Sequence, residues 1–207
     1  DNVVRNSTVP VLQTGAGNCH IFIDHDADFE MTKNIVINAK TQRPAVCNAV
    51  ETLLVHKAWA DSHLKELLDI LLSSGVEIHG DEMVCGICKE AIPATEDDWK
   101  FEYLDLKIAV KTVSGVEEAI DHISRYGTKH TETILSFDEE NIRRFMQDVD
   151  AAAVSHNASS RFTDGFEYGL GAEIGISTQK LHARGPMGLK EITSYKYRVY
   201  GSGQIRK

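Results

Sequence analysis

Apolar and polar residues follow two spacings that alternate along most of the chain. Short apolar runs at residues 20–23 and 53–55 predict buried strands. Elsewhere apolar residues recur every three or four positions, most clearly over residues 61–74, where leucines share one face and Gly75 follows to end the helix. This alternation of strand-like and helix-like segments predicts an α/β fold.

The remaining predicted elements continue the alternation. In chain order they are a helix after Asp24, Asp26 and Asp28, an extended segment at 76–79, surface structure around a weak helix at 81–100, a strand at 106–113, a helix ending at Gly127, a strand at 131–137, a helix at 138–149, a strand at 151–155 and an exposed strand at 195–200. Residues 114–117 (SGVE) predict a capping box. Residues 157–175 form a polar loop that is long for a simple connection.

Composition and charge narrow the class of protein. The 207 residues are 42% hydrophobic and 26% charged, as in ordinary globular proteins, which excludes a disordered tail, a collagen-like repeat and a membrane span. The formal net charge of −9 repels phosphate backbones and anionic lipid surfaces. We therefore expect neither nucleic acid nor a membrane as partner, and local cations must meet any anionic ligand.

The cysteines indicate the redox compartment. Four of them are too few for a disulfide framework in a chain of this length, and no charged-then-apolar leader precedes them. We therefore expect a cytoplasmic location. The chain begins with Asp1 rather than methionine, and we expect that an absent N-terminal portion holds part of the function.

The pattern predicts no metal site. Cys85 and Cys88 form a lone C-x-x-C without the second ligand pair that structural zinc needs. The nine histidines are scattered, and no two lie four positions apart on one predicted helix. Carboxylates at 24, 26 and 28 have the spacing that starts an EF-hand loop, but its glycine and bidentate glutamate are missing, so helix capping explains them better.

Cys47 is the candidate nucleophile. It follows the predicted end of a helix and lies shortly after Pro44, a residue suited to opening a helical turn. The dipole of such a turn, with Lys40 and Arg43 nearby, predicts a lowered thiol pKa and a reactive thiolate. The alternative is a small buried hydrophobic residue. No partner base stands at a diagnostic spacing, and a preformed thiolate needs none to attack an acyl phosphate or an aldehyde.

Residues 157–165 gather short hydrogen-bonding side chains around Arg161 in a predicted loop. Such a set suits a carboxylate or a phosphate, which an arginine binds through bidentate charge-assisted hydrogen bonds. An ordinary polar loop is the alternative, and Asp164 would partly neutralise the site.

Five spaced runs, taken in order, resemble one known family. They are residues 38–48 (NAKTQRPAVCN), 51–56 (ETLLVH), 157–165 (NASSRFTDG), 170–178 (LGAEIGIST) and 182–188 (HARGPMG). Together they closely resemble γ-glutamyl phosphate reductase, the proline-biosynthesis branch of the aldehyde dehydrogenase superfamily, over essentially all 207 residues. The resemblance implies the α/β catalytic domain of the aldehyde dehydrogenase architecture, with a parallel sheet flanked by helices.

The resemblance also implies a reaction: reduction of L-glutamyl 5-phosphate to L-glutamate 5-semialdehyde by NADPH, with release of phosphate. Cys47 matches the family's nucleophile, whose thiolate would form a thioester while its own backbone N–H holds part of the oxyanion. Glu102 matches the superfamily's contact to the nicotinamide ribose. The substrate loop supplies the residues assigned to the glutamyl or phosphate end of the substrate: Asn157, Ser159, Arg161 and Thr163.

Two features of the superfamily are absent from the chain. Residues 12–17, which match the general-base glutamate of hydrolytic aldehyde dehydrogenases, contain no acid, and this favours phosphate as the acyl acceptor. The dinucleotide-binding half and the side-chain oxyanion donor are missing, and no glycine run completes a dinucleotide fingerprint. We expect residues 1–17 to be the trailing end of the cofactor-binding half, 18–165 the catalytic thiol domain, and 166–207 a return segment with an oligomerisation strand.

Several alternatives stay open at this point. The parent protein is either a free-standing reductase or the reductase half of a fused pyrroline-5-carboxylate synthetase. A hydrolytic aldehyde dehydrogenase would oxidise its substrate without phosphate. The non-enzymatic alternative is an interaction module, with zinc bound through Cys85 and Cys88. For the enzyme we expect a homo-oligomer formed through the strand at 195–200.

Overall fold

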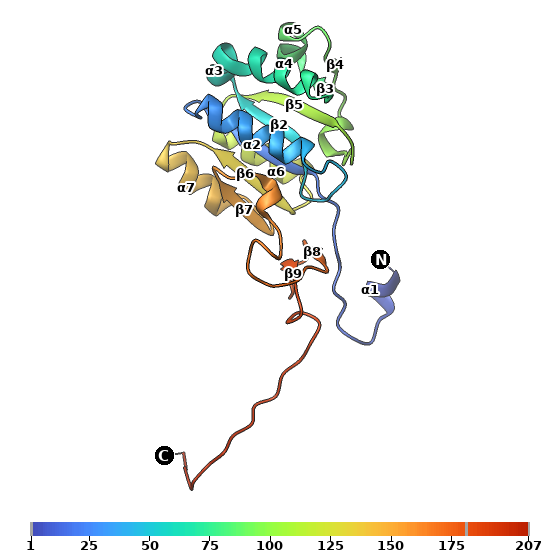
Figure 1. Cartoon of the computed structure of the whole chain (residues 1–207), viewed down its shortest axis with the longest axis vertical. Coiled ribbons are helices and arrows are strands. Elements are labelled where there is room, and N and C mark those ends of the chain that lie inside the picture. Colours follow the sequence, from blue (N-terminus) through green and yellow to red (C-terminus); the bar gives the residue numbers. More distant parts are fainter. Residues whose placement is uncertain (1, 181, 207) are drawn as a thin grey trace.

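The computed structural model describes residues 2–180 and 182–206. Its centre is a seven-stranded parallel sheet in the order β4-β3-β5-β2-β1-β6-β7. The strands are β1 (Cys19–Ile23), β2 (Val50–His56), β3 (Glu77–Gly80), β4 (Ile92–Pro93), β5 (Lys107–Val113), β6 (Thr131–Leu135) and β7 (Ala153–His156). Helices cover both faces of this sheet (Figure 1), which confirms the predicted α/β fold with a parallel sheet flanked by helices.

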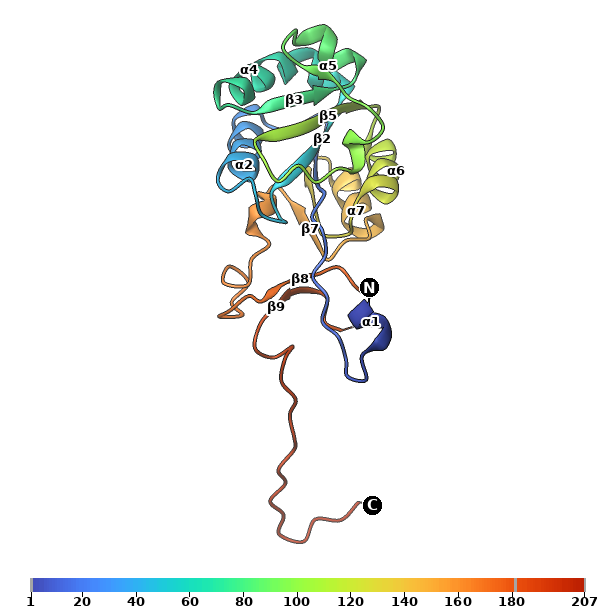
Figure 2. The ribbon, with the colours of Figure 1, turned by 90° about the vertical axis from the view of Figure 1, so that its right-hand side faces the viewer.

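The helices divide between the two faces, as Figure 2 shows for α2 and α4 on one side and α6 and α7 on the other. The first face carries α2 (Phe29–Thr41), α3 (Lys57–Trp59), the π-helical turn Ala60–Leu64, α4 (Lys65–Ser73) and α5 (Glu82–Ile87). The second face carries α6 (Val116–Tyr126) and α7 (Glu139–Asp148). Short 3-10 turns at Asp98–Lys100 and Ser160–Phe162 lie in the connections.

The central strands are buried on both faces, which explains their continuous apolar sequence. Ile21 and Ile23 of β1 pack into the core under α2 to α5, while Phe22 between them packs into the core under α6 and α7. Parallel strands covered on both sides need apolar residues at successive positions rather than at alternate ones. The short apolar run at residues 20–23 therefore indicated a strand correctly.

Capping residues set several helix ends. Asp28 caps α2, since its Oδ1 accepts the Met31 N–H at 2.7 Å, and Gly75, with φ +80°, follows the end of α4. The predicted capping box before α6 is wrong by one residue. Gly115 is the N-cap, and Glu118 rather than Glu117 reaches back to the Ser114 N–H and hydroxyl, both at 2.8 Å.

One fully buried ion pair and one fully buried contact between a histidine and a glutamate lie in the core. Lys40 Nζ donates to Glu51 Oε2 at 2.7 Å, and His20 Nδ1 lies 2.9 Å from Glu132 Oε2. Burial raises the pKa of Glu51 to about 7, although the Lys40 ammonium opposes this, and burial lowers the pKa of Lys40. Removing one partner of such a pair leaves an uncompensated buried group, so each pair constrains the elements that it joins.

His122 is a further buried polar side chain, on the inner face of α6. His122 packs edge-on against Trp99 and His20, with ring centroids 5.8 and 5.6 Å apart. Burial lowers the pKa of His122 to about 3 and that of His130 to about 4. Both imidazoles are therefore neutral in the folded protein at neutral pH.

The segments at residues 2–15 and 189–206 lie outside the main body (Figures 1 and 2). Helix α1 (Asn2–Asn6) is followed by a segment that contacts the antiparallel pair β8 (Gly175–Ser177) and β9 (Gly185–Met187), and the Gly15 N–H donates to the Ile176 carbonyl at 3.4 Å. Among the described residues no strand is assigned after β9, and Tyr197 is 84% exposed. The oligomerisation strand at 195–200 thus stays a prediction.

None of the helices in residues 2–180 and 182–206 is both long and apolar enough to cross a membrane.

The buried neutral histidines predict sensitivity to acid. An unfolded histidine, with a pKa near 6.5, takes up a proton before folded His122 does, so falling pH favours the unfolded state. We expect the free energy of unfolding to fall between about pH 6 and pH 4, by about 1.4 kcal/mol per pH unit for each such histidine. Urea unfolding of His122→Leu at several pH values should give a flatter dependence.

His25 provides a control of opposite sign. A hydrogen bond to Asp24 raises the pKa of His25, so its contribution to stability is present at low pH and is lost as the pH rises. His25→Gln should therefore abolish a gain in stability that occurs as the pH falls toward about 6.5, and leave the slope between about pH 6 and pH 4 unchanged. A profile for His122→Leu parallel to that of the unmodified protein would contradict the prediction.

Candidate active site

Cys47 lies in a turn directly before β2, at the amino end of the parallel sheet. The start of β1 lies beside this turn, because Cys19 pairs with Val50 in the parallel register. The Cys19 thiol donates a hydrogen bond to the Cys47 carbonyl oxygen at 3.1 Å. A Cβ atom on Gly17 would lie 1.5 Å from the same oxygen, so only glycine fits there. The first residues of β1 therefore hold the Cys47 backbone in place.

The electrostatic environment of Cys47 differs from the one predicted. Burial raises the pKa of the Cys47 thiol, the negative charges of Glu173 and Glu102 raise it further, and the Arg161 charge lowers it. The predicted lowering is wrong because no helix begins at Cys47 and the Lys40 ammonium is buried in an ion pair. In this chain the site therefore favours the thiol over the thiolate.

Gly17 connects the Glu102 side chain with the Cys47 turn. Its Oε1 accepts the Gly17 N–H at 2.7 Å. The segment that follows is held by Glu51, whose Oε1 accepts the Leu104 N–H at 3.3 Å. Leu104 has φ +55°, a left-handed conformation that costs a leucine energy, so this hydrogen bond helps to hold the segment in its path. The structure thus brings the Glu102 carboxylate and the Cys47 turn together on two sides of one glycine.

The predicted substrate loop contacts Asn48, the neighbour of Cys47. The Ser160 hydroxyl donates to the Asn48 carbonyl at 2.7 Å, and the Asn48 amide donates to the Thr163 carbonyl at 2.9 Å. The Arg161 guanidinium donates to Asn48 Oδ1. The Thr163 hydroxyl is fully buried and has no hydrogen-bond partner within the described part of the chain. Arg161 and Thr163 are therefore connected to Cys47 through a single residue.

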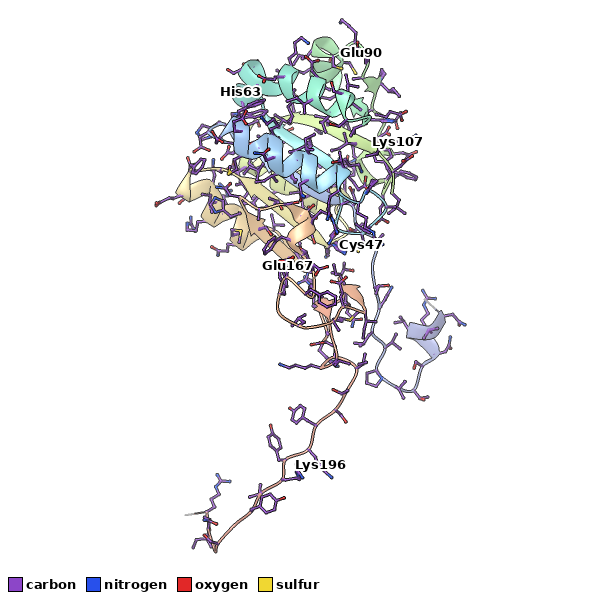
Figure 3. The ribbon with its side chains drawn as sticks, viewed as in Figure 1. Cys47, His63, Glu90, Lys107, Glu167 and Lys196 are labelled. Carbon is purple, nitrogen blue, oxygen red and sulfur yellow. The ribbon has the colours of Figure 1, made fainter. Side chains whose placement is uncertain are left out.

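A cavity of about 340 Å³ lies beside this loop. It is lined by Asn38, Gln42, Ser159, Arg161, Phe162, Asp164 and Glu167. Arg161 Nε donates to Gln42 Oε1 at 2.7 Å, which holds the guanidinium in the cavity wall. Figure 3 shows Glu167 and Cys47 at the same end of the main body. The wall therefore presents both a positive charge and carboxylates near the Cys47 turn.

Asn157, which the resemblance groups with the substrate loop, lies at the other end of the sheet. Its side chain accepts the Ser136 N–H at 3.0 Å and donates to the Ser136 carbonyl at 3.1 Å. Ser136 follows β6 and Asn157 follows β7, so both lie at carboxyl ends of strands. With both polar groups engaged, Asn157 anchors the start of the loop and does not join Arg161 beside Cys47.

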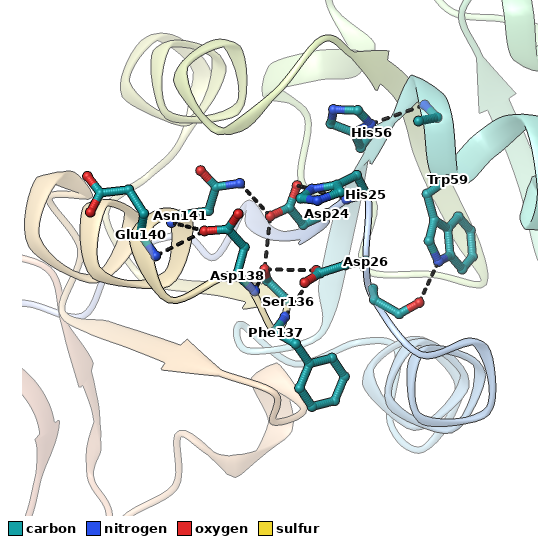
Figure 4. Close-up of polar contacts among 12 residues, drawn as sticks. Asp24, His25, Asp26, His56, Trp59, Ser136, Phe137, Asp138, Glu140 and Asn141 are labelled. Atoms are coloured by element: carbon teal, nitrogen blue, oxygen red, sulfur yellow. Dashed lines mark hydrogen bonds and ion pairs between the residues drawn. The ribbon is translucent and has the colours of Figure 1, made fainter.

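The carboxyl end of the sheet holds a separate polar cluster (Figure 4). Asp24 Oδ2 accepts from the Ser136 hydroxyl at 2.9 Å and from the Asn141 amide at 2.8 Å. Asp26 Oδ1 accepts from the same hydroxyl at 3.1 Å. Burial alone would raise the pKa of Asp24, but these hydrogen bonds and those of His25 lower it. The cluster joins the loop after β1 to the loop after β6.

This geometry revises the interpretation of the acidic run at 24–28. Helix capping is confirmed for Asp28 and is wrong for Asp24 and Asp26, which bond to the loop after β6 instead. One potential ligand atom from each of Asp24, His25 and Asp26 lies within 4.8 Å of the others. Both Asp24 oxygens already accept hydrogen bonds within the protein.

Glu173 is the residue near Cys47 that the sequence did not reveal. Its Oε2 accepts the Gly165 N–H at 2.8 Å, and its charge acts on the Cys47 thiol more strongly than that of Glu102. Glu173 lies within the run LGAEIGIST, which contributes to the resemblance, but no spacing connects it with Cys47. Only the return of the chain after the substrate loop brings the two together.

Comparison with solved structures shows the fold class of the chain. No family model matches the chain. The solved acetylating aldehyde dehydrogenase of Geobacillus thermoglucosidasius superposes with a TM-score of 0.71 at 18% identity, over 100% of this chain and 55% of that one. At this identity the likeness concerns the fold alone. The fold is that of the aldehyde dehydrogenases.

Relatives of higher identity are γ-glutamyl phosphate reductases. γ-Glutamyl phosphate reductase 1 of Bacillus licheniformis is 64% identical over 206 residues, which cover 100% of this chain and 50% of the relative. The crystal structure of γ-glutamyl phosphate reductase from Thermotoga maritima matches with a TM-score of 0.92 at 53% identity, over 100% of this chain and 50% of that one. Over its whole length the chain is similar to one half of these γ-glutamyl phosphate reductases. It spans about half the length of the curated relatives that it matches.

The close approach at Gly17 gives a test of the site geometry. Gly17→Ala places a methyl group against the Cys47 carbonyl, so we expect a loss of about 1–3 kcal/mol of stability and a several-fold change in the rate of Cys47 alkylation by iodoacetamide. Peptide mass spectrometry distinguishes Cys47 from the other cysteines.

Gly86→Ala is the matched control. Its added Cβ meets nothing within 4 Å and lies inside α5, where alanine is the better helix former. It should leave the alkylation rate unchanged. An unchanged rate in Gly17→Ala would show that the start of β1 does not control the position of Cys47.

Proposed function

We propose that the protein containing this chain reduces L-glutamyl 5-phosphate to L-glutamate 5-semialdehyde with release of phosphate, and that the chain is its C-terminal, catalytic half. The observation that carries the proposal is that Cys47, Glu102 and Arg161 converge from distant segments, in a chain with this similarity. A nucleophilic thiol, a carboxylate for the cofactor and a cation for the anionic substrate are the groups that this reaction needs.

Cys47 supplies the nucleophile. Its thiol loses a proton, the sulfur attacks the acyl carbon, and the bond from that carbon to the phosphate oxygen breaks, which leaves a thioester and free phosphate. The Cys47 backbone N–H holds part of the developing oxyanion. Because burial and nearby carboxylates raise the pKa of the Cys47 thiol, its ionisation depends on charges that arrive with the bound ligands.

The loop around Arg161 binds the substrate. The guanidinium is held by Asn48 and Gln42 and offers its remaining N–H groups to a carboxylate or a phosphate. Ser159 shares the cavity wall, and the buried Thr163 hydroxyl is a hydrogen-bonding group still without a partner in the described residues. These features support the assignment of Ser159, Arg161 and Thr163 to the substrate, with Asn157 holding the loop.

NADP(H) is the proposed cofactor. Glu102 lies beside the thiol with one carboxylate oxygen engaged by Gly17, and such a carboxylate accepts hydrogen bonds from ribose hydroxyls. Bound NADPH would supply the hydride that reduces the thioester. An engineered glycolyl-CoA reductase of the same fold has been solved with NADP⁺. The other contacts of the dinucleotide would come from the half of the protein that precedes this chain.

The domain organisation and assembly follow from the same proposal. In this proposal, residues 1–17 are the trailing end of the cofactor-binding half and residues 18–165 form the catalytic thiol domain. Residues 166–207 form a return segment and the oligomerisation strand. The hydrogen bond from the Gly15 N–H to the Ile176 carbonyl joins the segment before β1 to β8, which supports placing these two segments together outside the thiol domain. Tyr195, Tyr197, Val199 and Tyr200 are all more than 80% exposed, which supports their burial against a second subunit. Relatives of twice this length favour a free-standing reductase.

Replacing the thiol tests the assignment of Cys47. In the full-length parent, Cys47→Ala should lower kcat for NADP⁺- and phosphate-dependent oxidation of L-glutamate 5-semialdehyde by about 10³-fold or more, because no thioester can form. Cys85→Ala, a half-buried thiol in α5, should retain activity. Turnover by Cys47→Ala at the rate of the unmodified enzyme would contradict the assignment of Cys47 as the nucleophile.

Omitting phosphate separates the reductase from a hydrolytic aldehyde dehydrogenase. Residues 12–17 contain no acid to activate water, so NADPH formation should stop without phosphate and resume when it is added. The product in the complete mixture should be the acyl phosphate. Sustained NADPH formation without phosphate, with free glutamate as product, would instead identify the hydrolytic enzyme.

A further inference from the structure

Glu173 is a half-buried carboxylate beside the proposed nucleophile. Its Oε2 accepts the Gly165 N–H at 2.8 Å, whereas Oε1 has no hydrogen bond and the carboxylate no ion pair within the described part of the chain. Gly165 comes two residues after Thr163, whose carbonyl holds the Asn48 side chain at 2.9 Å. A short series of contacts therefore connects the Glu173 carboxylate with the Cys47 turn, and one of its oxygens is free to accept a donor.

The charges that act on Cys47 are unbalanced. Glu173 and Glu102 are negative, and Arg161 is the cation that opposes them. The Cys19 thiol, which also faces the Cys47 turn, is buried and carries no charge at neutral pH, since burial raises its pKa. A neighbouring carboxylate without a cation raises the pKa of a thiol and so disfavours the thiolate that attacks the substrate. The carboxylate becomes compatible with the chemistry once a cation pairs with it.

The proposed substrate carries such a cation a few bonds from its reacting carbon. In L-glutamyl 5-phosphate the α-ammonium nitrogen is four bonds from the acyl carbon, which is about 5 Å in an extended chain. A molecule whose acyl carbon rests on Cys47 would therefore extend its ammonium group into the region of the Glu173 carboxylate. Ammonium groups donate charge-assisted hydrogen bonds to carboxylates.

We infer that Glu173 binds the α-ammonium group of the substrate and selects α-amino acyl substrates over analogues that lack the amine. This inference rests on the proposed function and adds to it the group that recognises the amino-acid end. The ammonium would also neutralise Glu173, one of the two carboxylates that disfavour the Cys47 thiolate.

A purely structural role for Glu173 is the alternative, and one substitution separates the two. Glu173→Gln keeps a side-chain oxygen to accept the Gly165 N–H but removes the charge. Glu191→Gln is the matched control, because Glu191 Oε2 accepts the Gly188 N–H at 2.7 Å in the same way and Glu191 is not among the charges that act on Cys47. If hydrogen bonding to a glycine is all that matters, the two variants should behave alike.

The first measurement uses the full-length enzyme with NADP⁺ and phosphate, on L-glutamate 5-semialdehyde and on glutarate semialdehyde, which lacks the amine. Each variant is compared with the unmodified enzyme on the same substrate, so cyclisation of the amino aldehyde cancels. Glu173→Gln should lower kcat/KM for the amino substrate by about 10- to 100-fold, mainly through KM, and should not lower that for glutarate semialdehyde. Glu191→Gln should change neither.

The second measurement needs no substrate. The pH at which Cys47 reaches half its maximal rate of alkylation by iodoacetamide should be lower in Glu173→Gln than in the unmodified enzyme, because a negative charge has been removed, and unchanged in Glu191→Gln. Equal losses of kcat/KM on both aldehydes, or no loss on either, would overturn the inference. An unmodified enzyme that oxidises neither aldehyde with phosphate would instead overturn the proposed function itself.

Discussion

The candidate site depends on the close approach of Gly17 and Cys19, where the chain enters β1, to the Cys47 carbonyl group. Gly17 can lie against that oxygen only because it has no side chain, and the Cys19 thiol donates to the same oxygen. The Gly17 N–H on the other side is bound by Glu102. The nucleophile and the carboxylate proposed for the cofactor are thus positioned by one glycine, and the parallel pairing of β1 with β2 fixes that glycine in space.

The two ends of the sheet have different roles. In open α/β sheets, ligands usually bind at the carboxyl ends of the strands, where the connections leave toward opposite faces. Here that position lies between β1 and β6, and Asp24, Ser136 and Asn141 fill it by bonding to one another. The Cys47 thiol lies at the amino end instead, on the side where residues 2–17 and 166–180 leave the main body (Figures 1 and 2). This placement is consistent with a site completed by the other half of the protein.

The reactivity of the thiol is the property on which the structure most changes the expectation. Basic residues close to Cys47 in sequence, such as Lys40, predicted a lowered pKa, but Lys40 is buried against Glu51. Burial and the carboxylates of Glu102 and Glu173, which are distant in sequence, raise the pKa. The charges that matter belong to residues that only folding brings near. The proposed role of Glu173 follows from this imbalance.

The α/β class, most of the strands and helices, and the choice of Cys47 as candidate nucleophile could be predicted from the sequence. Apolar runs such as residues 20–23 and caps such as Asp28 act on neighbouring residues, so the strands and helix ends that they produce can be predicted from the sequence. The tertiary structure decided the amino-end position of Cys47, the separation of Asn157 from Arg161, and the presence of Glu173. These depend on strand register and on the path of a long loop, which bring together residues that no local pattern relates.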